Sequence, residues 1–321
     1  MHSSSRRWAE SVNRLLALLV LLVAAAAPAT AQKRIAFTFD DAPRIPGAFL
    51  TPDERTAKLI DGLKRAGVRQ VAFFVNPGNL SQPWGKGGED RLNAYVAAGH
   101  VLGDHSMTHP HLNAMSAEAY VANIDQAEAF LKPHDGYRPW FRYPFLDEGG
   151  PDAAKREAVR AGLKARHLTS GFVTADGADW NMEGNAIAAV QAHKAIDMQA
   201  LHDLYVESMV QGTDFYDALA RRALGSQPSQ VILMHETDLA ALWIADVVSA
   251  LRADGWEIVT ADQAFADPVW KKVMESPSIE SNLTSNLAMA KGINPSSYER
   301  IDTGVANRLF AERVLKEQPG K

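Results

Sequence analysis

The chain has 321 residues, of which 46% are hydrophobic, 22% charged and 8% aromatic, a composition typical of one or two globular domains. Its 33 basic and 38 acidic residues give a net charge of −5, which argues against a nucleic acid or acidic lipid partner bound through its phosphates. The chain contains no cysteine, so disulfides, thiolate metal sites, iron–sulfur clusters and cysteine nucleophiles are excluded. Any metal must therefore be bound by His, Asp or Glu.

The first 31 residues have the features of a secretory signal peptide. Three arginines precede the uncharged run 15–27, and the small residues Ala29-Thr30-Ala31 match a signal-peptidase site. A membrane anchor is disfavoured, because the run is shorter than the roughly 17 to 25 apolar residues that cross a bilayer. Cleavage before Gln32 would remove three Arg and one Glu, leaving 30 basic and 37 acidic residues and a net charge of −7. We therefore expect an exported protein, periplasmic or secreted, without a stable membrane anchor.

Strand-like and helix-like patterns alternate along the rest of the chain. Thr51-Pro52-Asp53-Glu54 predicts a capping box with Pro in the first helical turn. Such alternation implies right-handed crossovers and a parallel sheet, and polar residues at strand ends would then gather on one face of a (β/α) barrel. The predicted strands are 34–40, 70–75, 100–103, 140–145, 167–174, 230–234 and 256–260. The predicted helices are 51–67, 89–98, one beginning near Ser116, 185–224 and 238–253.

The region after Asp267 differs in composition, with frequent Ser, Asn and Pro. Weak helical patterns cover about 279–290 and 305–317. A packed C-terminal extension and a mobile tail are both compatible with this pattern.

Two short motifs carry residues suited to a metal site. His105 and His109 are four positions apart, which would place both imidazoles on one side of a single helical turn starting near Ser106. Asp40 and Asp41 follow an apolar strand, so one carboxylate could bind a metal while its neighbour acts as a base. A His2Asp set leaves coordination positions open, which is typical of catalytic sites. The alternative for the paired Asp is a turn or a helix cap.

Five ordered motifs give the chain a resemblance to a known family. They are Thr38-Phe39-Asp40-Asp41, His105-Ser106-Met107-Thr108-His109, Arg142-Tyr143-Pro144-Phe145, Asp179-Trp180 and Leu233-Met234-His235. Together they resemble the polysaccharide deacetylases, the NodB-homology or carbohydrate esterase 4 group, over about residues 33–266. The resemblance implies an α/β fold, a distorted and incomplete (β/α) barrel. It also implies a catalytic domain over 32–267 with an insertion at about 181–230, followed by a helical extension over 268–321.

The resemblance also implies a metal and an acid–base pair. Asp41, His105 and His109 would bind zinc, although Fe, Co or Ni suit the same ligands. Zinc would bring the pKa of its bound water close to neutral. Asp40 would be the general base, and His235 the general acid that protonates the leaving amine.

The remaining motif residues would support that chemistry. Arg142 would hold Asp40 ionised through a charge-assisted hydrogen bond. Asp179 would orient His235. Three residues would bind the acetyl group: Phe145 through its backbone N–H at the oxyanion, and Trp180 and Leu233 as apolar walls. Taken singly, Arg142 also fits a surface ion pair, Trp180 a core aromatic and His235 a structural histidine.

Three positions depart from the family pattern. Ala42 replaces a usual Gly, Tyr143 stands where Pro is common, and Glu236 follows His235 where Asp is usual. The substitution at Ala42 matters only if that residue needs a positive φ. None of the three is a predicted ligand or acid–base group.

The sequence therefore predicts an exported, zinc-dependent hydrolase that removes acetyl groups from a polysaccharide. N-acetyl groups of peptidoglycan or a chitin-like glycan are favoured over O-acetyl esters of xylan. The alternatives are an amidase on a small carbon–nitrogen substrate, and a non-catalytic periplasmic protein that binds glycan or metal. Asp40 and His235 argue against the last, since a binding protein has no use for an acid–base pair.

Because the chain would have a net charge of −7 after cleavage, we expect its substrate to be a neutral glycan rather than a polyanion. The sequence gives no indication of the oligomeric state.

Overall fold

The computed structural model describes residues 32–271, 281–294 and 298–317. The predicted signal peptide, residues 1–31, lies outside them, as do the first positions of the helix predicted over 279–290. Within the described ranges, no helix is both long enough and apolar enough to span a bilayer.

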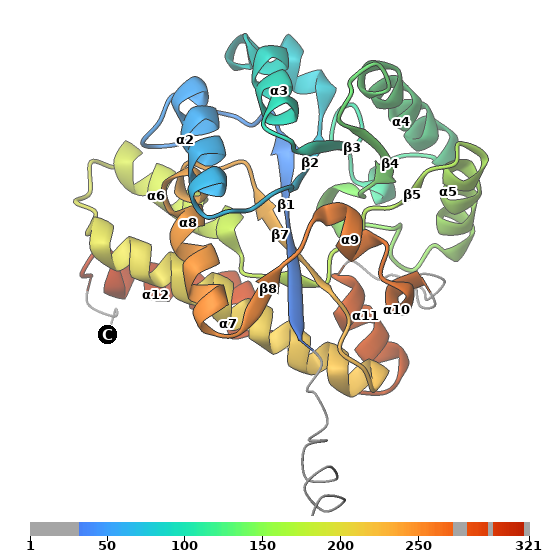
Figure 1. The fold of residues 1–321 in the computed structure, drawn as a ribbon. Helices are drawn as coiled ribbons and strands as arrows, with labels where there is room; N and C mark the ends of the chain where they lie inside the picture. The colour runs from blue at the N-terminus through green and yellow to red at the C-terminus, as the bar shows by residue number, and fades with distance from the viewer. Residues whose placement is uncertain (1–31, 272–280, 295–297, 318–321) are drawn as a thin grey trace, which may run out of the picture. The chain divides into compact units, whose positions relative to one another are not determined.

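A single sheet of eight strands, all paired in parallel, forms the centre of the fold. Its order is β5-β4-β3-β2-β1-β7-β6, and β8 pairs with β1 outside this path. Figure 1 shows β1 in the middle of the curled sheet. The strands are β1 (Lys33–Ala42), β2 (Ala72–Val75), β3 (Val101–Asp104), β4 (Tyr137–Phe141), β5 (Thr169–Ser170), β6 (Ala175–Asp176), β7 (Gln230–His235) and β8 (Trp256–Ile258). The sheet is the predicted incomplete (β/α) barrel, with β5 and β6 at its two edges.

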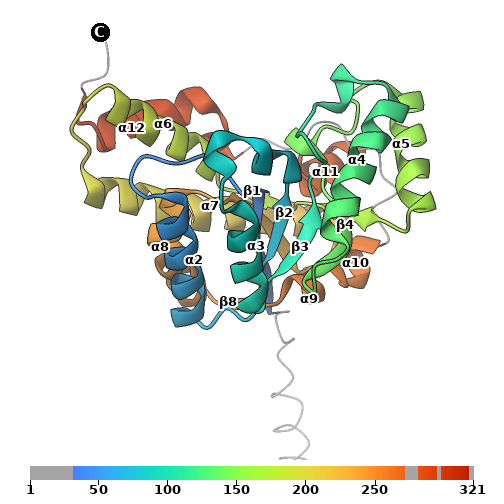
Figure 2. The same cartoon turned by 90° about the horizontal axis from the view of Figure 1, so that it is seen from above.

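Helices cover the outside of the sheet (Figures 1 and 2). They are α2 (Pro52–Arg65), α3 (Gly88–Ala97), α4 (Ala117–Leu131), α5 (Ala153–Ala165), α6 (Asp179–Gln191), α7 (Met198–Leu224), α8 (Asp238–Ala253), α9 (Ala261–Phe265), α10 (Pro268–Lys271), α11 (Leu283–Ala290) and α12 (Thr303–Arg313). Short 3-10 turns include η1 (Pro77–Ser81) and η4 (Pro144–Leu146). The buried face of β1 packs Ile35, Phe37 and Phe39 into the main core.

Local capping signals were accurate predictors of helix starts. Thr51 accepts a hydrogen bond from the Glu54 backbone N–H, and the Glu54 carboxylate accepts one from the Thr51 N–H, which completes the predicted capping box. Ser116 caps α4, because its Oγ accepts a hydrogen bond from the Ala119 backbone N–H. Helix α8 has its predicted bounds.

Three local predictions were wrong. The strand predicted over 167–174 is only the two residues of β5, because the chain then leaves the sheet and returns at β6. The strand predicted over 140–145 begins earlier and gives way to η4. The helix predicted over 185–224 is two helices, α6 and α7. Helix α5 was not predicted from the sequence.

The C-terminal part of the chain packs onto the domain where it is described. Leu287 and Ala288 of α11 and Phe310 of α12 belong to the main buried cluster. Arg300 donates a hydrogen bond to Ser208 Oγ of α7 at 2.9 Å and pairs with Glu207. Residues 283–290 and 303–313 are therefore built into the same hydrophobic core as the sheet.

Candidate metal centre and active-site cavity

A cavity of about 580 Å³ opens at the carboxyl ends of the strands. Eight of the ten predicted site residues line it: Asp40, Asp41, His105, His109, Phe145, Trp180, Leu233 and His235. They come from the ends of β1 and β7, from the turn after β3, from η4 and from the start of α6. The other two, Arg142 and Asp179, are buried behind this lining, where each contacts an acid–base residue.

Asp41, His105 and His109 form a compact group of possible metal ligands. One ligand atom from each lies within 4.8 Å of the other two. Asp41 Oδ1 is 3.2 Å from His109 Nε2 and 3.7 Å from His105 Nε2. This oxygen is buried and has no hydrogen-bond partner of normal geometry in the described part of the chain. A buried, unsatisfied carboxylate oxygen facing two imidazole nitrogens fits a divalent cation with nitrogen and oxygen ligands.

The two histidines are brought together by a turn, and the predicted helical turn was wrong. Ser106 and His109 both have left-handed backbones, with φ of 66° and 54°. Asp104 Oδ1 accepts a 2.6 Å hydrogen bond from the Ser106 N–H, and Ser106 Oγ accepts one from the His109 N–H. Asn76 Nδ2 donates to the carbonyls of His105 and Ser106. The local bonds of Asp104 and Ser106, together with the long-range bonds from Asn76, fix the turn that directs both rings at Asp41.

The orientation of His105 is fixed by a backbone carbonyl. Its Nδ1 is 2.9 Å from the carbonyl oxygen of Arg142, so Nδ1 carries the proton and Nε2 presents a lone pair towards Asp41. Burial lowers the pKa of His105 to about 4. The ring is therefore neutral near pH 7, the state in which imidazole binds metals.

Asp41 is held as a carboxylate in an unusual backbone conformation. Its φ is 68°, whereas Ala42 is not among the residues with positive φ, so replacement of the usual Gly at position 42 causes no strain. Burial opposes ionisation of Asp41, but His109, Arg44 and His235 together keep its pKa well below the ordinary value. Arg44 forms an ion pair with Oδ2, which leaves Oδ1 facing the histidines.

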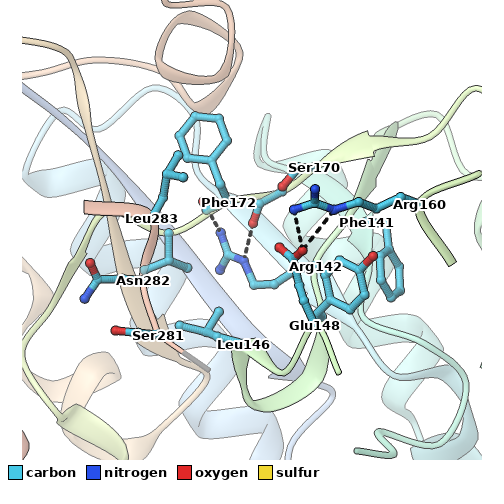
Figure 3. Close-up of a pocket in the computed structure, with 13 residues that line it drawn as sticks. Phe141, Arg142, Leu146, Glu148, Arg160, Ser170, Phe172, Ser281, Asn282 and Leu283 are labelled. Carbon is cyan, nitrogen blue, oxygen red and sulfur yellow. Dashed lines mark hydrogen bonds and ion pairs between the residues drawn. The ribbon is translucent and has the colours of Figure 1, made fainter. Parts of the chain in front are cut away.

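Asp40 is bound by a buried arginine. Arg142 Nη1 donates to Asp40 Oδ1 at 2.5 Å, and both side chains are almost completely buried. The same guanidinium donates to Thr38 Oγ1 and to the carbonyl oxygen of Gly171, and it lies 3.8 Å from the centre of the Phe74 ring. Figure 3 shows Arg142 bonded to the segment that follows β5. With its partners fixed, Arg142 holds the Asp40 side chain in one position through a charge-assisted hydrogen bond.

Asp179 binds His235 through both carboxylate oxygens. Oδ1 is 2.8 Å from His235 Nδ1, and Oδ2 accepts a 2.7 Å hydrogen bond from the His235 N–H. Burial disfavours the imidazolium, but the charge and hydrogen bond of Asp179 outweigh it and raise the pKa of His235 above its ordinary value. His235 lines the cavity, and its Nε2 has no hydrogen-bond partner among the described residues, the arrangement expected of a general acid.

The three residues predicted to bind the acetyl group border the cavity. Phe145 and Trp180 are 52% and 39% exposed, whereas Leu233 is buried. The Phe145 ring stacks on His111 with centroids 3.6 Å apart, and its φ is 58°. His111, the third nearby imidazole, does not line the cavity. Exposed aromatic faces at a cavity mouth suit the apolar face of a sugar ring.

Several lining residues were missed by sequence reasoning. They are Arg44, Leu146, Asp176, Tyr216, Ser281, Asn282, Ser285, Met289 and Ile301. Only Asp176 had a usable signal, a carboxylate after a predicted strand. Burial raises its pKa to about 6. Arg44 and Leu146 lie within three residues of a motif, whereas Tyr216 and the residues after 280 lie far from the motifs in sequence and reach the cavity only through tertiary packing.

Two departures from the family pattern are explained by packing. Tyr143 is buried in a small cluster beside Tyr120 and Phe141. Glu236 is fully buried and accepts hydrogen bonds from Tyr95 Oη and from the Arg44 N–H, both at 2.8 Å. Neither Tyr143 nor Glu236 lines the cavity.

Comparisons with known proteins agree with this fold. The family model described as polysaccharide deacetylase matches residues 27–165, which include three of the five motifs. A chitin deacetylase of Colletotrichum lindemuthianum is 32% identical over 113 residues, covering 35% of this chain and 42% of that protein. A peptidoglycan-N-acetylglucosamine deacetylase of Listeria monocytogenes is 23% identical over 262 residues, covering 81% of this chain and 44% of that protein. The chain thus spans less than half the length of these relatives.

The fold is shared with a solved deacetylase. The structure of the chitin deacetylase from Colletotrichum lindemuthianum covers 74% of this chain and 90% of its own, with a TM-score of 0.51 at 21% identity. The chain therefore has the incomplete barrel of the carbohydrate esterase 4 proteins. The family match over residues 27–165 confirms the resemblance to the polysaccharide deacetylases.

Proposed function

We propose that this protein is an exported, zinc-dependent deacetylase that hydrolyses acetyl groups, chiefly N-acetyl groups, on a chitin-like glycan or peptidoglycan. The observation that carries the proposal is one cavity that joins a possible metal site, a buried carboxylate and an oriented imidazole. The relatives named chitin deacetylase and peptidoglycan-N-acetylglucosamine deacetylase support the choice of substrate.

Asp41, His105 and His109 would hold the metal. The neutral His105 ring and the ionised Asp41 supply nitrogen and oxygen donors that suit Zn²⁺, and Fe, Co or Ni suit the same set. A cation bound there would acidify water and polarise the acetyl carbonyl. Because Arg44 occupies Asp41 Oδ2, Oδ1 remains available as a ligand.

Asp40 would act as the general base. Its Oδ1 is engaged by Arg142, while Oδ2 lies 3.6 Å from His105 Nε2, close to the possible metal position. Oδ2 would take a proton from the attacking water. The Arg142 guanidinium would hold Asp40 in place throughout the reaction.

His235 would act as the general acid. Attack on an N-acetyl group leaves an amine that must be protonated before the carbon–nitrogen bond breaks. The bond from Nδ1 to Asp179 keeps the ring in one orientation and favours its protonated form, so Nε2 would donate the proton. The Phe145 backbone N–H would contribute to binding the oxyanion.

Trp180 and Leu233 would enclose the acetyl methyl group, because both line the cavity beside the acid–base pair. An apolar pocket of this size discriminates by about 1 to 3 kcal/mol per methylene, so it would select acetyl over longer acyl groups more than it drives the reaction.

Acetate release from defined substrates tests the proposal. Purified protein lacking residues 1–31 would be assayed on chitooligosaccharides, peptidoglycan and acetylxylan, beside Asp40→Asn. We expect release from an N-acetylated glycan and a loss of at least 100-fold in kcat for Asp40→Asn, because the base is removed. Release from none of the three substrates, or equal rates in the wild type and Asp40→Asn, would contradict the proposal.

A further inference from the structure

Residues beyond the predicted deacetylase domain line the same cavity as the acid–base pair. Five of the lining residues belong to the C-terminal extension: Ser281, Asn282, Ser285, Met289 and Ile301. We refer to these five residues as the C-terminal wall. No role for this part of the chain follows from the sequence motifs, all of which lie before residue 236.

The C-terminal wall is anchored where the barrel is incomplete. Residues 171–174 connect the edge strands β5 and β6. The Leu283 N–H donates to the carbonyl oxygen of Val173 at 2.7 Å, and Thr284 Oγ1 donates to that of Thr174 at 2.8 Å. Figure 3 shows Asn282 and Leu283 beside Phe172. The start of α11 is therefore fixed against the open side of the barrel.

Polar side chains dominate the inner part of this side of the cavity. Tyr216 of α7 lines it together with Asn282 and Ser285, which are only 5% and 6% exposed. Asp176, at the end of β6, lines the same cavity. Hydroxyl, amide and carboxylate groups are the partners that sugar hydroxyls bind. Met289 adds an apolar contact at the mouth, where it is 40% exposed.

The charges in the cavity favour a neutral sugar. Asp40, Asp41 and Asp176 are its carboxylates, and Arg44 is the one Lys or Arg among the described lining residues. Arg44 is already paired with Asp41. Among the described lining residues, no unpaired Lys or Arg is therefore left to bind a substrate carboxylate.

We propose that the C-terminal wall, with Asp176 and Tyr216, is a binding subsite for the hydroxyl groups of a neutral acetylated sugar. This inference rests on the proposed deacetylase function and adds its substrate determinant. A sugar ring held against the wall would present its acetyl group to Asp40 and His235 on the other side of the cavity.

Kinetics on two substrates of different size test the subsite. A neutral chitooligosaccharide needs the sugar contacts, whereas an aryl acetate needs only the acetyl-cleaving groups. For Ser285→Ala and Met289→Ala we expect KM for the oligosaccharide to rise roughly threefold to tenfold, as for one lost hydrogen bond or apolar contact. The kcat on the oligosaccharide and the rate on aryl acetate should stay unchanged. Met198→Ala is the matched control, since Met198 is also 40% exposed but does not line the cavity.

Two outcomes would overturn the subsite. One is an unchanged oligosaccharide KM in both wall variants, and the other is an equal loss on both substrates, which would indicate a structural role alone. A further experiment compares the neutral oligosaccharide with one whose acetylated sugar carries a carboxylate. We expect a KM at least tenfold higher than for the neutral sugar, and an equal or lower KM would refute the preference for a neutral sugar.

Failure of the subsite can be separated from failure of the proposed function. If the wild type releases no acetate from any substrate, the deacetylase proposal fails and calorimetric binding of the chitooligosaccharide tests the wall alone. Binding by the wild type that weakens at least threefold in Ser285→Ala would support the subsite. Equal binding by both proteins, or none by the wild type, would refute it.

Discussion

Asp179 binds both the side chain and the backbone N–H of His235, through two oxygens at 2.8 and 2.7 Å. This double contact fixes the position of the residue as well as the orientation of its ring. It links the start of α6 to the end of β7 through two residues that are 56 positions apart in the chain. The predicted acid is thus held by tertiary structure.

Asp179→Asn should lower kcat for deacetylation about 100-fold with little change in KM, because the acid loses the group that favours its protonated form. Asp179 raises the pKa of His235, so a protonated His235 persists to higher pH in the wild type. The basic limb of the pH–rate profile should therefore move to lower pH in the variant. Measuring kcat as a function of pH for the wild type and Asp179→Asn tests this shift. An unmoved basic limb would show that His235 is not the acid.

Arg142→Met should reduce the free energy of unfolding by about 3 to 5 kcal/mol, because it leaves Asp40 buried without its cation. Adding Asp40→Asn to the same chain should restore part of this loss, since the unpaired charge is then removed. Urea denaturation of the wild type, both single variants and the double variant gives the coupling energy. Additive losses would indicate that the two side chains do not interact in solution.

The ionisation of Glu183 should make the free energy of unfolding fall as the pH rises from about 4.5 to 7. Burial, followed by the charge of Asp238, raises the pKa of Glu183 to about 7. The folded state then binds more protons than the unfolded state in this window, so this contribution is complete below the unfolded pKa and is lost as the pH rises towards 7. Glu183→Gln cannot titrate, and its unfolding free energy should decline less from pH 5 to pH 7.5, by on the order of 1 to 3 kcal/mol. Parallel slopes for the two proteins would contradict the shifted pKa.

Much of the fold could be predicted because its signals are local. The alternation of Ile35, Phe37 and Phe39 marks β1, and the Thr51 capping box marks the start of α2. Strands β5 and β6 have two residues each, too few for a periodic pattern. The segment between α6 and α7 likewise contains no Pro or Gly that would have predicted a break in the helix.

The site could be predicted in its motifs but not in its geometry. Spacing suggested that His105 and His109 share a helical turn. Instead, Ser106 donates a hydrogen bond to Asp104 and accepts one from Asn76, and these bonds build a different turn. The residues of the C-terminal wall have no motif at all. Ser285 reaches the cavity only because α11 packs on α7 and is bonded to the segment between β5 and β6, and such long-range contacts are not encoded in any local pattern.

The central claim, that one divalent cation held by Asp41, His105 and His109 is required for deacetylation, is tested most directly by metal titration. Protein stripped with a chelator would be titrated with Zn²⁺, following heat of binding and acetate release from a chitooligosaccharide together. We predict one ion per chain, restoration of activity in proportion to occupancy, and loss of both signals in Asp41→Asn. Full activity in the stripped protein, or unchanged zinc binding in Asp41→Asn, would contradict the claim.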